Sequence, residues 1–144
     1  MAKQITYKEK VNEHNEELLN RYLKELPSFC QDYFDGRSGL SFSSKLAYAY
    51  KFKPFFEYLH DSHPAFCDTP VVEYTLDMLN SISKKDILIW QQELLKKKAS
   101  DDTYMYTKET VDNYSSCLSS LFKYFVSDDD AILRRNVFSS IDKL

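Results

Sequence analysis

The stretch that decides the fold is Thr107–Phe125, TKETVDNYSSCLSSLFKYF, read together with Ser43–Leu59, SSKLAYAYKFKPFFEYL. In the later stretch apolar residues recur every three or four positions, the spacing of one helix face: Val111, Tyr114, Leu118, Leu121 and Phe125. The earlier stretch repeats this plan with Phe42, Leu46, Ala49, Phe52, Phe56 and Leu59. Polar groups crowd the N-terminal turns of both. The sequence therefore predicts two helices, each with a packing face and polar side chains for contacts.

The rest of the chain also predicts helices. Two glycines and four prolines among 144 residues, with 43% hydrophobic residues, favour long regular elements over a turn-rich β fold. Pro27 interrupts a helical pattern from Glu13 to Phe34, which predicts two helices. Ser83 with Asp86 forms a capping-box pattern. We expect an all-α fold, a single orthogonal bundle of about five helices in which residues 1–12 are frayed and residues 128–130 end the last long helix.

The cysteines and the N-terminus bear on location. Cys30, Cys67 and Cys117 are odd in number and widely spaced, so neither a disulfide framework nor a metal motif is indicated. We expect reduced core thiols in a cytoplasmic protein. No apolar run approaches the roughly 20 residues of a membrane span, and the N-terminus lacks the apolar region of a secretory signal.

Net charge argues against a nucleic-acid partner, but its distribution weakens that objection. The whole chain carries −3, whereas DNA-binding domains commonly have excess Lys and Arg. Residues 9–35 hold seven acidic residues against three basic ones, while residues 39–54 hold Lys45, Lys51 and Lys53 and no acid. DNA responds to the local field at the contact face. The acidic part is therefore expected to point away from such a face.

The order of several residues resembles the N-terminal core-binding, SAM-like domain of tyrosine recombinases, the family of phage integrases and Xer proteins. The resemblance covers about Leu26 to Leu144 and is carried by Ser44, Tyr48, Phe52, Phe55–Leu59, Thr110, Asn113, Ser116, Leu118 and Leu121–Phe125. Residues 118–124 and 135–137 look most like the single-recombinase Xer branch.

The resemblance implies a division into residues 1–25 as a partly helical extension, 26–133 as the core-binding domain, and 134–144 as the start of a tether to a catalytic domain. It implies double-stranded DNA as partner, together with that catalytic domain and other protomers in a synaptic tetramer. In the family the common proline of the tether stands where this chain has Val137. No cofactor, metal or membrane is implied, and this part alone would cut nothing.

The candidate DNA-binding residues lie at the beginnings of the two helices. Hydroxyl and lysine side chains hold phosphates, and an amide such as Asn113 can pair with adenine in the major groove. The candidates are Ser43, Ser44, Lys45, Tyr48, Lys51, Thr107, Lys108, Thr110 and Asn113, with Ser116 as a weaker addition. On composition alone, N-capping hydroxyls and solvated lysines explain them better; the resemblance reverses that preference.

Other chemistry is poorly supported. Eleven tyrosines suggest a nucleophile, but the arginines, lysine and histidine that surround the phosphate in the family lie in its C-terminal domain. His60 and His63 lack a convincing set of metal ligands. The alternative from another class is a helical protein–protein interaction module, which the acidic net charge favours and in which the Phe55–Phe56 and Leu121–Phe122 pairs form an exposed apolar groove. An unrecognised small enzyme is the third possibility.

Overall fold

Eight helical segments make up the regular structure of the described residues. The computed structural model describes residues 6–126 and 131–144, and within these it has no named strand, only an isolated bridge between Lys98 and Tyr104. The elements are α1 (Tyr7–Leu23), α2 (Ser28–Asp35), α3 (Phe42–Ser62), the 3₁₀ turn η1 (Val71–Glu73), α4 (Leu76–Leu79), α5 (Lys84–Lys96), α6 (Lys108–Val126) and the 3₁₀ turn η2 (Val137–Ser140). The predicted all-α class is confirmed. Residues 1–5 and the predicted helix end at 128–130 lie outside the described part.

Local capping groups set where the helices begin. Ser83 and Asp86 form the predicted capping box at α5, and Ser41, rather than Ser43 or Ser44, caps α3 through the Ser44 amide. The break at Pro27 separates α1 from α2, as predicted. The prediction that residues 1–12 are frayed was wrong for residues 7–12, because a capping box between Thr6 and Glu9 starts α1 at residue 7.

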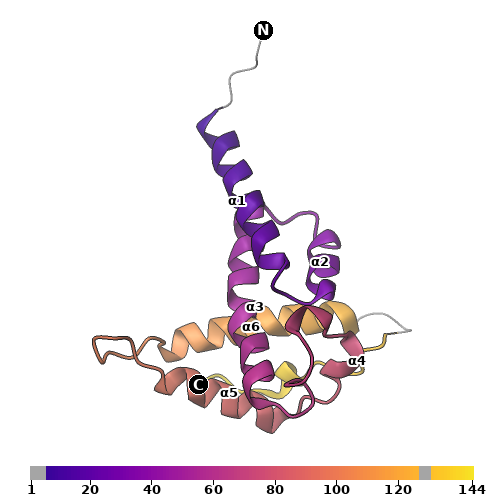
Figure 1. The fold of residues 1–144 in the computed structure, drawn as a ribbon, viewed down its shortest axis with the longest axis vertical. Helices are drawn as coiled ribbons and strands as arrows, with labels where there is room; N and C mark the ends of the chain where they lie inside the picture. The colour runs from indigo at the N-terminus through magenta and orange to yellow at the C-terminus, as the bar shows by residue number, and fades with distance from the viewer. Residues whose placement is uncertain (1–5, 127–130) are drawn as a thin grey trace.

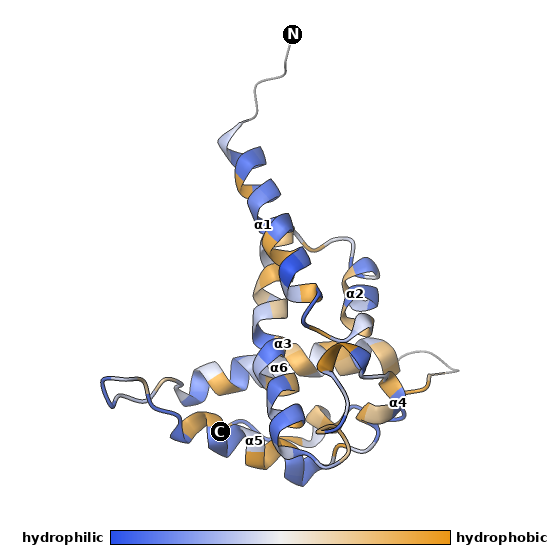
Figure 2. Cartoon of the chain, viewed as in Figure 1, coloured by the Kyte–Doolittle hydropathy of each residue, from blue (hydrophilic) through white to orange (hydrophobic). Residues whose placement is uncertain are grey.

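Two long helices cross at the centre of the molecule. Figure 1 shows α3 running along the long axis, with α1 beside it and α6 crossing it. Helix α5 runs alongside α6, and η2 packs against both. The N-terminal part of α1 projects from the body, and Figure 2 shows that it is mainly hydrophilic. The crossing brings segments about sixty residues apart in sequence into contact.

The core beneath the crossing is largely aromatic. Phe55 of α3 lies edge-on to Trp90 of α5 at 5.1 Å and to Phe138 of η2 at 5.4 Å, both between ring centroids. Phe122 of α6 lies 5.1 Å from Phe138 in the same geometry. Such pairs contribute about 0.5–1.5 kcal/mol each beyond the burial of their surface. Four elements are therefore joined through one cluster of rings.

The segment predicted to begin a tether packs against this core. Val137 and Phe138 are buried, and Asn136 caps η2 while its amide nitrogen donates to the backbone and hydroxyl oxygens of Ser119. At the end of the segment, the Leu144 amide donates to Asp112 of α6. The domain boundaries at 25 and 133 remain predictions.

Cysteine burial corrects one expectation. Cys30 and Cys117 are buried, and burial raises the pKa of both thiols, but Cys67 is exposed. The prediction that all three are core thiols was therefore wrong for Cys67. It lies just after the C-terminal end of α3, where the chain turns toward η1.

The only close approach that requires a glycine lies between the end of α2 and α6. A Cβ atom at Gly36 would overlap the Tyr124 hydroxyl, although the Gly36 φ of −75° suits any residue. Gly39 has nothing within 4 Å of the same position. Space, and not backbone conformation, therefore demands glycine at position 36.

Candidate nucleic-acid interface

The buried Tyr33 of α2 joins the elements at the crossing. Its hydroxyl lies 2.7 Å from the Ser120 hydroxyl of α6 and accepts a hydrogen bond of 3.0 Å from Arg37. The Tyr48 ring of α3 packs edge-on against the Tyr33 ring at 6.5 Å. Burial raises the pKa of Tyr33, against the opposing influence of Ser120 and Arg37. This cluster fixes the position of Tyr48, one of the predicted contact residues.

A second link joins the candidate residues of α3 and α6. The positive charge of Lys51 acts on the Cys117 thiol, opposing the burial that raises its pKa. The Cys117 sulfur in turn lies 4.0 Å from Oδ1 of Asn113, one helical turn earlier. Lys51 is half-buried and Asn113 is exposed. The fold therefore brings Lys51 and Asn113 into one neighbourhood from sixty residues apart.

The first turn of α3 carries three other candidates. Ser43 is exposed, and its hydroxyl makes no hydrogen bond to another described residue. The Ser44 hydroxyl accepts a hydrogen bond from the Ser41 hydroxyl, which leaves its own hydrogen available. The Lys45 ammonium lies 5.7 Å from the centre of the Phe42 ring. Ser41 therefore serves as the N-cap, and Ser43, Ser44 and Lys45 keep hydrogen-bond donors that could contact a ligand.

At the beginning of α6 the candidate hydroxyl groups form hydrogen bonds within their own helix terminus. The Thr107 hydroxyl accepts from the Thr110 amide and lies 2.9 Å from the Thr110 hydroxyl. Thr107 therefore acts as an N-cap, which is the ordinary role of threonine at this position. Lys108 is exposed, next to the exposed Glu109.

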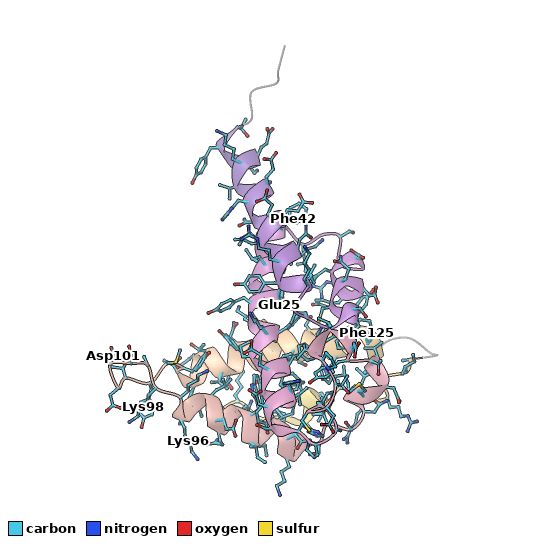
Figure 3. All side chains as sticks on the ribbon, in the orientation of Figure 1. Glu25, Phe42, Lys96, Lys98, Asp101 and Phe125 are labelled. Atoms are coloured by element: carbon cyan, nitrogen blue, oxygen red, sulfur yellow. The ribbon has the colours of Figure 1, made fainter. Side chains whose placement is uncertain are left out.

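The two helix beginnings lie on separate arms of the crossing. At 1.5 Å per residue, Lys45 lies about 9 Å along α3 from Lys51, and Lys108 about 14 Å along α6 from Cys117. Figure 3 shows Phe42 at the outer end of α3, and Lys98 and Asp101 on the loop that leads into α6. Neither lysine is buried. A DNA-binding surface that includes both Lys45 and Lys108 must therefore extend from the crossing along the N-terminal halves of α3 and α6.

Lys53 is held differently from its neighbours on α3. Its ammonium lies 2.6 Å from Glu25 and 4.0 Å from Glu57, and the bond with Glu25 raises the pKa of Lys53. Its charge is thus already compensated within the protein. Of the three lysines in the acid-free segment, Lys45 and Lys51 are the ones that keep an uncompensated charge among the described residues.

Sequence reasoning missed Arg37 and Ser120. The segment DGRSG at 35–39 was interpreted as a helix stop, yet Arg37 donates to both Tyr33 and Ser120 across the crossing. The spacing of four residues from Tyr33 to Arg37 could have suggested the contact. Ser116, the weaker candidate, borders a shallow hollow of about 270 Å³ with Asp112 and the C-terminal segment.

The side chains considered for other chemistry have structural partners. Nδ1 of His63 accepts from the Ala65 amide and Nε2 lies 3.0 Å from Asp86. The five tyrosines with a shifted pKa are all shifted upward by burial, opposite to the need of a nucleophile; they are Tyr33, Tyr58, Tyr74, Tyr106 and Tyr114. Across residues 6–126 and 131–144, no group of three or more acidic, His or Cys residues is arranged to hold a metal ion.

Comparison with known proteins gives the wider setting. The chain is 25% identical over 126 residues to the tyrosine recombinase XerS of Lactococcus lactis subsp. lactis (strain IL1403). It is 24% identical over 126 residues to tyrosine recombinase XerS of L. lactis subsp. cremoris, in strains MG1363 and SK11. The chain is related to the Xer tyrosine recombinases.

These matches cover most of this chain but a minor part of the relatives. Each includes 81% of the chain and 35% of the relative, so the chain spans about a third of the length of the curated recombinases it matches. No protein-family model and no solved structure matches it. The similarity agrees with the resemblance to tyrosine recombinases that the residues of α3 and α6 indicate.

None of the helices in the described part combines the length and the apolar character needed to cross a bilayer. The longest, α3, has 21 residues but contains Lys45, Lys51 and Lys53.

Proposed function

We propose that this chain is the DNA-binding half of a tyrosine site-specific recombinase, in which α3 and α6 grip a recombination half-site. The observation that carries the proposal is the crossing itself, where Lys51 and Tyr48 of α3 lie beside the Asn113–Cys117 turn and Ser120 of α6. The relationship to Xer recombinases supplies the reaction class.

Local charge supports a duplex as the ligand despite the net charge of −3. Lys51 and Lys45 of α3 and Arg37 beside the crossing have no ion pair among the described residues. The acidic residues Glu9, Glu13, Glu16 and Glu17 are on α1, whose N-terminal part projects from the body. Exposed charges separated by more than a Debye length of about 8–10 Å are largely screened. The carboxylates at the projecting end of α1 therefore contribute little to the field at the crossing.

The structure removes the apolar groove on which the alternative function partly rested. An interaction module was expected to use the Phe55–Phe56 and Leu121–Phe122 pairs as an exposed groove, but all four side chains are 0% exposed. They form the core under the crossing and cannot contact a partner. That prediction was wrong because adjacent aromatic residues at these positions pack against opposite neighbours, α5 and α2, within the bundle.

In the whole protein, we propose that a separate catalytic domain supplies the nucleophilic tyrosine and its surrounding cations. That domain and the present one would enclose each half-site, and protomers would assemble as a synaptic tetramer. The phosphotyrosine bond conserves the energy of the cleaved phosphodiester, so the chemistry requires neither metal nor nucleotide. This chain binds the half-site and positions it relative to the catalytic domain. We expect a cytoplasmic location.

The test is the salt dependence of binding to duplex DNA. Phosphate contacts are independent of sequence, so a mixed-sequence duplex serves without knowledge of the target site. Each of Lys45→Gln, Lys51→Gln and Lys108→Gln should lower the slope of log K against log salt by about 0.9, the value for one phosphate contact. Lys53→Gln is the matched control, because Glu25 already holds that lysine.

The proposal fails if the wild-type chain does not bind duplex at low salt. It also fails if none of the three substitutions changes the slope more than Lys53→Gln does. Asn113→Ala tests base readout separately, since losing a bidentate pair costs about 1–3 kcal/mol of discrimination and leaves the salt slope unchanged.

A further inference from the structure

Arg37 is held at the crossing by two neutral hydroxyl groups. Its Nη1 donates to the Tyr33 hydroxyl at 3.0 Å and to the Ser120 hydroxyl at 3.3 Å, while its guanidinium carbon lies 5.5 Å from the centre of the Tyr33 ring. An arginine fixed by a tyrosine at spacing i, i+4 and by a serine 83 residues away is not an ordinary solvated side chain.

Arg37 has no ion-pair partner in the described part of the chain. No carboxylate of residues 6–126 or 131–144 forms an ion pair with it, and the structure assigns hydrogen bonds only to its Nη1 and backbone. A guanidinium has five N–H donors in a planar fork that fits the oxygens of a phosphate. Nε and Nη2 therefore keep their donors for another acceptor.

The hydrogen bond between the Tyr33 and Ser120 hydroxyl groups leaves one hydroxyl hydrogen without an acceptor. Tyr33 and Ser120 oxygens lie 2.7 Å apart, so one hydroxyl hydrogen lies between them. Either hydroxyl could donate at this distance, but Tyr33 is 0% exposed and its hydroxyl has no other acceptor among the described residues, so we assign Tyr33 as the donor to Ser120. The hydrogen of the partly exposed Ser120 hydroxyl is then free to point outward. Arg37 and Ser120 thus present only donors.

We infer that Arg37 and Ser120 form a seat for one phosphate of the duplex backbone, with the buried Tyr33 as the residue that positions Arg37. This inference rests on the proposed function for the identity of the anion. Lys51 and Tyr48 lie around the same cluster, so the seat is at the centre of the crossing, between the two helix beginnings. A phosphate held there fixes the register of the duplex against both helices.

The first experiment measures duplex affinity as a function of salt. Arg37→Gln should lower the slope of log K against log salt by about 0.9, as expected for one lost phosphate contact. Arg21→Gln, which removes the same charge from the exposed face of α1, is the matched control and should leave the slope unchanged. Equal slopes for the two variants would overturn the inference.

The second experiment tests the positioning role of Tyr33, which is too deeply buried to touch DNA. Tyr33→Phe keeps the ring and removes the hydroxyl, and it should weaken duplex binding by at least about twofold, the lower end of couplings between contacting residues. The same change in an Arg37→Gln background should have no further effect. The control is Tyr74→Phe, which removes a different buried hydroxyl, one that donates to the Phe66 carbonyl at 3.0 Å.

A third measurement separates this inference from the proposed function. Inorganic phosphate titrated into the labelled protein should shift the NMR signals of Arg37 and Ser120, and Arg37→Gln should abolish the shift at Ser120. If these signals shift while duplex does not bind, the anion seat stands and the proposed function fails. If duplex binds while the signals do not respond and Arg37→Gln behaves like Arg21→Gln, the seat is refuted and the function stands.

Discussion

Replacing Phe138 by alanine tests whether the C-terminal segment is part of the folded core. Its side chain is 4% exposed and its ring lies 5.1 Å from Phe122, 5.4 Å from Phe55 and 6.3 Å from Trp90. Truncation of a buried phenylalanine costs about 3–5 kcal/mol, through lost transfer free energy and the cavity left behind. Small domains have a total stability of about 5–15 kcal/mol, so the loss would be a large fraction of it.

Urea unfolding followed by tryptophan fluorescence suits this measurement, because Trp90 is the single tryptophan and belongs to the same ring cluster. Phe138→Ala should lower the free energy of unfolding by about 3–5 kcal/mol. Ile132→Ala, at a side chain that is 59% exposed, should change it by no more than about 0.5 kcal/mol. A loss below about 1 kcal/mol for Phe138→Ala would refute the docked arrangement and favour a free tether from residue 134.

Three further predictions concern stability. Partial burial alone would raise the pKa of Asp86, but hydrogen bonds with Ser83 and the charge of a nearby histidine hold it below its ordinary value. The ionised Asp86 side chain therefore adds to the free energy of unfolding above the unfolded pKa of about 3.9, and this addition is lost as pH falls through the lower folded pKa. In Asp86→Asn, acid unfolding should lack the part of the pH dependence that comes from this carboxyl group. Gly36→Ala should cost about 1–3 kcal/mol in urea unfolding, because the new methyl overlaps a tyrosine ring of α6, whereas Gly39→Ala should be near neutral. Ser41→Ala should cost about 1 kcal/mol as a lost N-cap while leaving duplex affinity almost unchanged at a temperature where the chain is folded.

Most of the fold could be predicted from the sequence because its signals are local. The helical spacing of apolar residues, the break at Pro27 and the capping box at Ser83 each act within a few residues, and the structure contains all three. The helix at residues 7–12 was missed although Thr6 and Glu9 have the capping-box spacing, since polar composition was given more weight than that pattern.

The candidate site was less predictable, because its contacts depend on how the helices cross. Nothing in the local sequence around Arg37 indicates Ser120, which lies 83 residues later. Likewise, Lys51 and Lys53 look equivalent in sequence, and only the folded structure pairs Lys53 with Glu25. The hydroxyls at 41, 43 and 44 are alternatives for one cap, and the backbone alone decides which of them serves.

The most direct test of the central claim is an NMR titration of the labelled chain with duplex DNA at low salt. The account predicts that the amide signals that shift will belong to Lys45, Tyr48, Lys51, Lys108 and Asn113 and their neighbours on α3 and α6. Signals of α5 and of the N-terminal half of α1 should stay in place. Shifts confined to α5 or α1, or none at all, would contradict the assignment of the crossing as the surface that binds DNA.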